Sequence, residues 1–178
     1  MSKRRQKSTI KFPEDPFTVG YICGFIDGEG CFNITIFKND SLSTGLTICP
    51  QFMIHVTKDN RKILNFIQKT LNSGIISFSK SSYQRDVRNL RARDASKYRI
   101  AKINDCIKLA EFLDGKLRVK QKDLESWKKI LKIIEEGRHL TKKGILEVAK
   151  IRDEMNNPQK SKRYKSYQWF EKYFNKKL

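Results

Sequence analysis

The stretch VGYICGFIDGEGCF, residues 19–32, decides the fold of this chain. Gly20, Gly24 and Gly28 recur at every fourth position, so on a helix they lie along one face. Each glycine costs roughly 1 kcal/mol relative to alanine inside a helix. A helix tolerates that cost when another backbone must approach closely, as in small-xxx-small packing. The spacing therefore predicts a helix that packs tightly along its glycine face.

Two acids, Asp27 and Glu29, close this stretch, and each is followed by glycine. A helix that ends here places their carboxylates beside backbone carbonyls that carry negative partial charge. Carboxylate and carbonyl oxygens are suitable ligands for a hard divalent cation such as Mg2+. A glycine-rich helix end whose acids merely face water would give the same string.

The charge balance favours a polyanionic partner. The chain has 178 residues, and 38 Lys and Arg against 19 Asp and Glu give a net charge of +19. Nucleic acid is favoured over membrane, because no basic amphipathic helix with a broad apolar face stands out. The sequence also has no apolar run of transmembrane length and no secretory signal. An intracellular protein is expected. The basic start, MSKRRQKST, favours a disordered DNA-contacting arm, although a chloroplast or mitochondrial address stays open.

The four cysteines predict a reduced interior. None of them forms a CxxC pair, and only two histidines could complete a zinc site. The four residues are Cys23, Cys31, Cys49 and Cys106.

The hydrophobic periodicity predicts an α+β fold with the order α-β-β-α-β-β-α, followed by further helices. This order implies a four-stranded antiparallel sheet with helices on one face. We expect helices at 18–27, 60–71, 104–114, 121–136 and 143–155, and strands at 31–37, 46–57, 75–79 and 97–103. We expect the chain to divide into three segments: a basic tail at 1–16, a main domain at 17–156, and a linker with a short aromatic helix at 157–178. The aromatic residues of the last segment could cap the core or meet DNA.

The outward side chains of the predicted strands favour contact with DNA bases and phosphates. They are Asn33, Thr35, Phe37, Gln51, Met53, His55, Ser77, Ser79, Lys97 and Arg99. A basic loop between the third and fourth strands adds Arg85, Arg88, Arg91 and Arg93. An ordinary solvated face would also be polar, but the neighbouring basic loop favours DNA.

The segment ICGFIDGEG, residues 22–30, resembles the signature helix of the LAGLIDADG homing endonucleases. Glu29 stands where the family has its metal-binding acid, which is usually aspartate. The resemblance implies the family's αββαββα saddle. It also implies that Glu29 and the carbonyl of Gly28 bind metal.

Two further segments support the resemblance. Residues 117–134, LRVKQKDLESWKKILKII, resemble the family's basic patch entering a helix, which implies that Lys120 lies near the scissile phosphate. Residues 55–67, HVTKDNRKILNFI, resemble the segment that carries the solvent-network residues, at Lys58 and Lys62.

The chain carries one such motif. Residues 109–117, LAEFLDGKL, echo it, but Glu111 replaces a packing glycine and Lys116 replaces the metal acid. A single glycine-faced helix predicts a homodimer packed through Gly20, Gly24 and Asp27.

The resemblance thus implies an intron-encoded, site-specific DNA endonuclease with Glu29, Lys120, Lys62 and Lys58 as catalytic residues. It would make a staggered double-strand break in a long pseudo-palindromic site by phosphodiester hydrolysis. Mg2+ is the expected cofactor, with Mn2+ tolerated and Ca2+ binding without cleavage. Two alternatives are an intron maturase that binds RNA and a non-catalytic dimeric DNA-binding regulator. The acid at position 29 argues against the regulator, because carboxylates beside DNA phosphates repel them.

Overall fold

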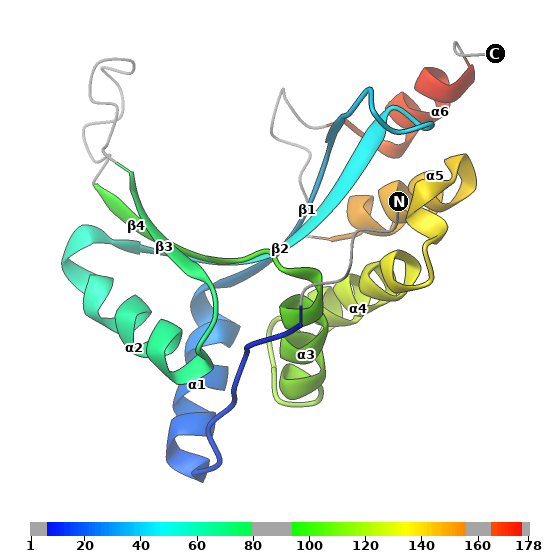
Figure 1. Ribbon diagram of the computed structural model, residues 1–178. Coiled ribbons are helices and arrows are strands. Elements are labelled where there is room, and N and C mark those ends of the chain that lie inside the picture. The colour runs from blue at the N-terminus through cyan, green and yellow to red at the C-terminus, as the bar shows by residue number, and fades with distance from the viewer. Residues whose placement is uncertain (1–6, 80–93, 156–164, 176–178) are drawn as a thin grey trace. The chain divides into compact units, whose positions relative to one another are not determined.

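The computed structural model describes residues 7–79, 94–155 and 165–175, in two compact units. Unit 1 comprises Met1–Cys31 and Gln51–Val119, and unit 2 comprises Phe32–Pro50 and Lys120–Leu178. The helices are α1 (Pro16–Glu29), α2 (Arg61–Leu71), α3 (Ile103–Leu113), α4 (Gln121–Glu135), α5 (Lys142–Asp153) and α6 (Tyr167–Asn175) (Figure 1). The strands are β1 (Gly30–Lys38), β2 (Leu46–Thr57), β3 (Ile75–Ser79) and β4 (Ala95–Ile100), with 3-10 turns η1 (Lys58–Asn60) and η2 (Arg138–Leu140).

The strands form one sheet in the order β1-β2-β4-β3. β4 pairs antiparallel with β2 on one side, where His55 faces Lys97, and with β3 on the other, where Ser77 faces Lys97. The predicted α+β class and its αββαββα order are therefore confirmed.

Helix α1 is longer at both ends than the predicted 18–27. Asp15 caps it by accepting the Thr18 N–H at 2.7 Å, and Pro16 supplies a preset φ in the first turn. At the other end the chain turns extended at Gly30. A Cβ there would lie 2.5 Å from the Ile26 carbonyl oxygen and 3.0 Å from the Phe52 ring, so only glycine fits.

In unit 1, α2 covers one face of β3 and β4 (Figure 1). Leu64, Ile67 and Leu71 of α2 are fully buried, as is Tyr98 of β4. The helix ends in a left-handed cap at Asn72, with φ 46°. The opposite face of these strands, which carries Lys97 and Arg99, has no helix over it in the described part of unit 1.

Residues 8–12 of the predicted tail pack onto unit 1. The Ser8 hydroxyl donates to Asp105 at 2.6 Å, the Lys11 N–H donates to the Leu71 carbonyl at 2.9 Å, and Ile10 is only 7% exposed. Phe12 stacks on Phe112 of α3 with ring centroids 4.3 Å apart. The disordered arm expected over residues 1–9 is therefore wrong for Ser8 and Thr9. We call residues 8–12 the strap.

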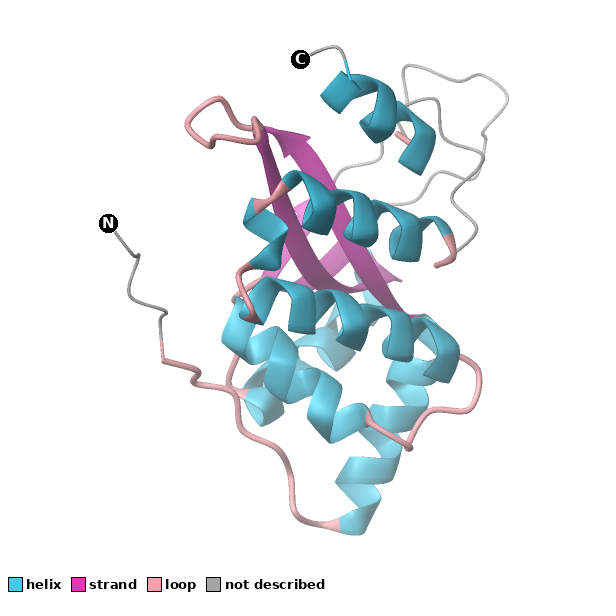
Figure 2. Ribbon diagram, turned by 90° about the vertical axis from the view of Figure 1, so that its right-hand side faces the viewer, coloured by secondary structure: helices cyan, strands magenta, loops and turns pink. Residues whose placement is uncertain are grey.

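In unit 2, α4 lies beside α5, and α5 lies beside α6 (Figure 2). Phe32 of β1 packs on Trp127 of α4, with ring centroids 5.1 Å apart, and both are fully buried. Phe170 of α6 is also fully buried, and the Arg152 guanidinium of α5 lies over its ring. Of the predicted roles for the aromatic segment, Phe170 thus fills the core of unit 2.

The predicted fourth strand, 97–103, is out of position. β4 begins at Ala95 and ends at Ile100, while Ile103 opens α3. The cause is local, because the Cys106 N–H donates to the Lys102 carbonyl and so starts the helical hydrogen bonding. The alternation of Tyr98 and Ile100 also stops here, because Lys102 is the next residue on that face and Ile103 is out of phase with it.

Candidate active site and nucleic-acid surface

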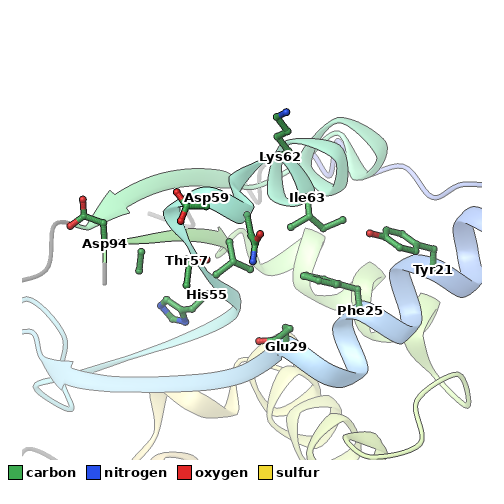
Figure 3. A pocket seen from close by; sticks show the side chains of 12 residues that line it. Tyr21, Phe25, Glu29, His55, Thr57, Asp59, Lys62, Ile63 and Asp94 are labelled. Atoms are coloured by element: carbon green, nitrogen blue, oxygen red, sulfur yellow. The ribbon is translucent and has the colours of Figure 1, made fainter. Parts of the chain in front are cut away.

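A cavity of about 680 Å3 lies in unit 1 at the end of α1. Figure 3 shows the labelled residues of α1 on one side of the cavity, Lys62 and Ile63 of α2 above them, and His55 and Thr57 of β2 opposite Glu29. The lining residues are Tyr21, Phe25, Glu29, His55, Val56, Thr57, Asp59, Asn60, Lys62, Ile63, Asp94 and Ala95. The cavity therefore brings together three of the predicted site residues, Glu29, His55 and Lys62.

Glu29 is the last residue of α1, and its exposed carboxylate borders the cavity (Figure 3). Within residues 7–79, 94–155 and 165–175, no group of three or more His, Cys, Asp and Glu could hold a metal ion. Mg2+ nevertheless needs only one or two carboxylates, because it keeps several waters and takes substrate phosphates as ligands. The single carboxylate of Glu29 is chemically suited to such a partly hydrated ion, and the metal-binding roles of Glu29 and of the Gly28 carbonyl stay predictions.

Asp27 has a structural partner inside the chain. Its carboxylate accepts the backbone N–H groups of Arg118 and Val119, each at 3.0 Å. These bonds tie the end of α1 to the segment that precedes Lys120 in the chain. The predicted role of Asp27 in a dimer interface stays a prediction.

The predicted catalytic lysines lie on different elements. Lys62 of α2 lines the cavity, but its ammonium points away from Glu29 (Figure 3). Lys58 lies outside the lining, over the Phe78 ring at 5.8 Å. Lys120 is the N-cap residue of α4 and belongs to unit 2. Their catalytic roles stay predictions.

His55 borders the cavity from the open face of β2. Burial, and then the positive charge of Lys97 across the β2–β4 pair, lowers the pKa of its imidazole below 6.5. The ring is therefore neutral at pH 7, with one nitrogen that donates and one that accepts a hydrogen bond.

The open face of the sheet in unit 1 carries the expected polar and cationic residues in registered rows. One row joins His55, Lys97 and Ser77, and the next joins Met53, Arg99 and Ile75. Gln51 is half-buried, and Ser79 pairs through its backbone with Ala95. Met53 needs a correction: it lies on this face but is only 9% exposed, and the long side chain of Arg99 stands opposite it.

On β1, Asn33 and Thr35 are half-buried, and the Asn33 amide donates to the Thr35 hydroxyl at 3.2 Å. Phe37 is 45% exposed, as expected for an outward residue. The four predicted loop arginines, Arg85, Arg88, Arg91 and Arg93, lie outside the described residues.

Several residues that line the cavity were not predicted from the sequence. Asp59 and Asn60 follow Lys58 directly, within a segment already singled out for its resemblance, so their position was a usable signal. Tyr21 and Phe25 lie one residue after the first two glycines of α1, and apolar type alone gives no hint of a cavity.

None of the four cysteines forms a disulfide bond, and Cys23 and Cys106 are buried. Over the ranges that the structure describes, none of the helices combines the length and apolar character needed to cross a bilayer.

Comparisons with known proteins agree on one family. The family model described as LAGLIDADG endonuclease matches residues 22–131. The probable intron-encoded endonuclease 3 of Neurospora crassa is 30% identical over 135 residues, which is 75% of this chain and 24% of that protein. The probable intron-encoded endonuclease 2 of the same fungus is 28% identical over 137 residues, 76% of this chain and 28% of that protein. This chain thus spans about a quarter of the length of these fungal relatives.

Solved structures are also similar to this chain over most of its length. The homing endonuclease I-TnaI superposes with a TM-score of 0.69 and 26% identity, covering 89% of this chain and 96% of that one. An archaeal intron-encoded homing endonuclease in complex with DNA gives a TM-score of 0.73 and 25% identity, covering 92% and 98%. The signature helix, the αββαββα order and these matches lead to one conclusion: the chain belongs to the LAGLIDADG endonuclease family and carries its motif once.

Proposed function

We propose that this chain is a site-specific, metal-dependent endonuclease that hydrolyses phosphodiester bonds in both strands of duplex DNA. The observation that carries the proposal is Glu29, an exposed carboxylate at the end of α1 that borders a cavity beside an open, cation-bearing sheet face. An exposed acid is unfavourable beside DNA phosphates unless a cation stands between them. Family membership supports the same activity.

Glu29 and the carbonyl of Gly28 would hold the divalent cation, with Mg2+ as the proposed ion and Mn2+ as a substitute. When bound, such an ion lowers the pKa of water and stabilises negative charge on the leaving oxygen. Lys62 orders solvent at the rim of the cavity, and Lys120 supplies positive charge to the scissile phosphate. Asp27 assists indirectly, because its bond to Val119 fixes the backbone immediately before Lys120.

The open sheet face would read base edges in the major groove. Arg99 and Lys97 are donors suited to guanine, and neutral His55 offers one donor and one acceptor. The exposed Phe37 and Ile75 supply apolar contacts of the kind that thymine methyl groups accept.

A second copy of the chain is the proposed partner of α1. A Cβ at Gly20, Gly24 or Gly28 would have no atom beyond the helix's own local turns within 4 Å, among the residues described. Phe17 and Tyr21 on the same helix are 83% and 47% exposed. A helix that is apolar on all sides is normally covered on all sides. The uncovered glycine face of α1 therefore fits an isologous contact with the same helix of a second copy.

The function is tested with a plasmid library that carries randomised inserts, incubated with the protein with and without Mg2+. Metal-dependent linearisation of a small subset of plasmids, with staggered ends at one sequence, is the expected result. Binding to duplex DNA without cleavage in either Mg2+ or Mn2+ would indicate a DNA-binding regulator. Binding only to structured RNA would indicate a maturase.

A further inference from the structure

A second cavity, of about 590 Å3, lies in unit 1 where α2 ends, β3 begins and β4 passes into α3. It shares no lining residue with the cavity at Glu29. Its lining comprises Thr9, Gln68, Lys69, Asn72, Ser73, Gly74, Ile75, Arg99, Ala101 and Lys102. We call it the cationic groove.

Three cations line the groove, and none of the lining residues is acidic. Lys69, Arg99 and Lys102 are all exposed, and none has an ion pair with another residue of the described chain. Three like charges around one cavity repel each other, and an anion placed between them relieves that repulsion. The charges are open to solvent, so the attraction is strongest at low salt.

The groups that could compete for these cations are already engaged. The carboxylate of Asp105 is fully buried, and the hydroxyls of Ser8 and Ser73 each donate to it at 2.6 Å. Among the carbonyls at the end of α2, that of Leu71 accepts the Lys11 N–H. The groove therefore presents its positive charge outward.

The strap gives the groove a fixed wall. Thr9 is a lining residue, and its carbonyl accepts the Asn72 amide at 3.1 Å. The bonds from Ser8 and Lys11 hold the residues on either side of it. The Gln68 amide donates to the Gly74 carbonyl at 3.0 Å, so the wall uses its own polar groups internally and leaves the cationic side chains to meet an anion.

The groove continues the open face of the sheet. Ile75 and Arg99 are register partners on that face, and both also line the groove. The open face and the groove therefore meet at Ile75 and Arg99.

We propose that the cationic groove binds the phosphate backbone of the DNA target, through Lys69 and Lys102, beyond the base pairs read by the sheet. This proposal rests on the proposed function, since it assumes that DNA lies on the open face. The groove contributes affinity without sequence preference.

The test compares the double variant Lys69→Ala with Lys102→Ala against the matched double variant Lys108→Ala with Lys150→Ala. The control removes the same charge from two exposed lysines that line neither cavity. The probe is a pool of random-sequence 40-bp DNA duplexes in Ca2+, titrated at several salt concentrations. We expect the groove variant to lower the log–log salt slope by about 1 per lysine, and the control to leave it close to wild type.

Phosphate-ethylation interference on a duplex selected by cleavage provides the second readout. Wild type should show a set of interfering phosphates in each half-site that disappears in the groove variant and persists in the control. Equal salt slopes in the two double variants, or unchanged phosphate interference, would overturn the proposal. A groove variant that binds structured RNA more weakly but binds DNA like the control would also overturn it. If the wild-type protein binds no DNA, the proposed function itself is wrong. If the wild type cuts DNA and the groove variant binds it like the control, only the proposed role of the groove is wrong.

Discussion

Both carboxylate oxygens of Asp27 lie 3.0 Å from the backbone nitrogen of Val119, and one also accepts the Arg118 N–H. The acid of the signature helix therefore fixes the chain immediately before Lys120. Two residues later, Glu29 turns its carboxylate toward the cavity instead. The two acids of the motif thus have different tasks, one structural and one proposed to be chemical.

Asp27→Ala should destabilise the protein by about 2 kcal/mol, because it removes the acceptor for two backbone N–H groups. The free energy of unfolding in urea measures this loss. Glu125→Ala, which removes an exposed acid of α4, is the matched control and should change stability by less than about 0.5 kcal/mol. Equal effects of the two substitutions would show that the Asp27 bonds contribute nothing specific.

Substitutions of Gly24, within α1, and of Gly30, directly after it, should affect different properties: the first assembly, the second stability. Gly24→Leu projects into open space within the chain, so the protomer should fold while the dimer dissociates. Gly30→Ala places a Cβ 2.5 Å from the Ile26 carbonyl, so it should lower the melting temperature without a specific effect on assembly. Sedimentation and thermal melts of both variants separate the two effects, and a dimeric Gly24→Leu would rule out the glycine face as the interface.

The strap should contribute to stability through the buried carboxylate of Asp105. Asp105→Ala leaves the Ser8 and Ser73 hydroxyls without their acceptor and opens a cavity, so we expect a loss of about 3 kcal/mol. Ser8→Ala removes one of the two bonds and should cost about 1 kcal/mol. Urea denaturation measures both losses, and an equal effect of the two variants would mean that Asp105 does not depend on Ser73.

Stability should fall on the alkaline side. Burial, and then the charge of Asp105, raises the pKa of the Cys106 thiol from 9.0 to about 12, and the same two causes raise the pKa of Tyr98 above 10.0. Above about pH 9 the unfolded chain loses these protons while the folded chain keeps them, so the folded state loses its advantage as pH rises. The stability difference between wild type and Cys106→Ala should therefore shrink from pH 8 to pH 10.5. A difference that stays constant over this range would contradict the raised pKa.

Most of the fold could be predicted from the sequence, because apolar and polar residues alternate along the strands and the helices have recognisable end signals. Residues 75–79 were placed correctly, since Gly74 with φ 85° and the left-handed Asn72 mark the turn before β3. The end of β4 was misplaced although the alternation of Tyr98 and Ile100 breaks at Lys102, the next position on the same face. Ile103 lies three residues after Ile100, a spacing typical of a helix rather than a strand.

The site was predicted less completely, for a physical reason. The signature helix identified Glu29, and the segment after β2 identified Lys62. The exposure of the other site residues depends on tertiary packing, which the sequence pattern does not contain. Met53 stands on the open face by strand alternation, yet neighbouring side chains leave it only 9% exposed. The cationic groove is assembled from α2, β4, α3 and the strap, and no short-range pattern links Lys69 with Lys102.

The direct test of the account is Glu29→Gln, with Glu111→Gln, which neutralises an exposed acid of α3, as the control. Neutralising Glu29 removes a metal ligand and also removes its repulsion against DNA phosphates. The measurement is the single-turnover cleavage rate of a selected duplex in Mg2+, with affinity for the same duplex measured in Ca2+. We predict that Glu29→Gln binds DNA as tightly as wild type or more tightly and cuts at least about 100-fold more slowly, while the control cuts normally. Cleavage by Glu29→Gln at the wild-type rate would contradict the account, because the catalytic metal site would then lie elsewhere.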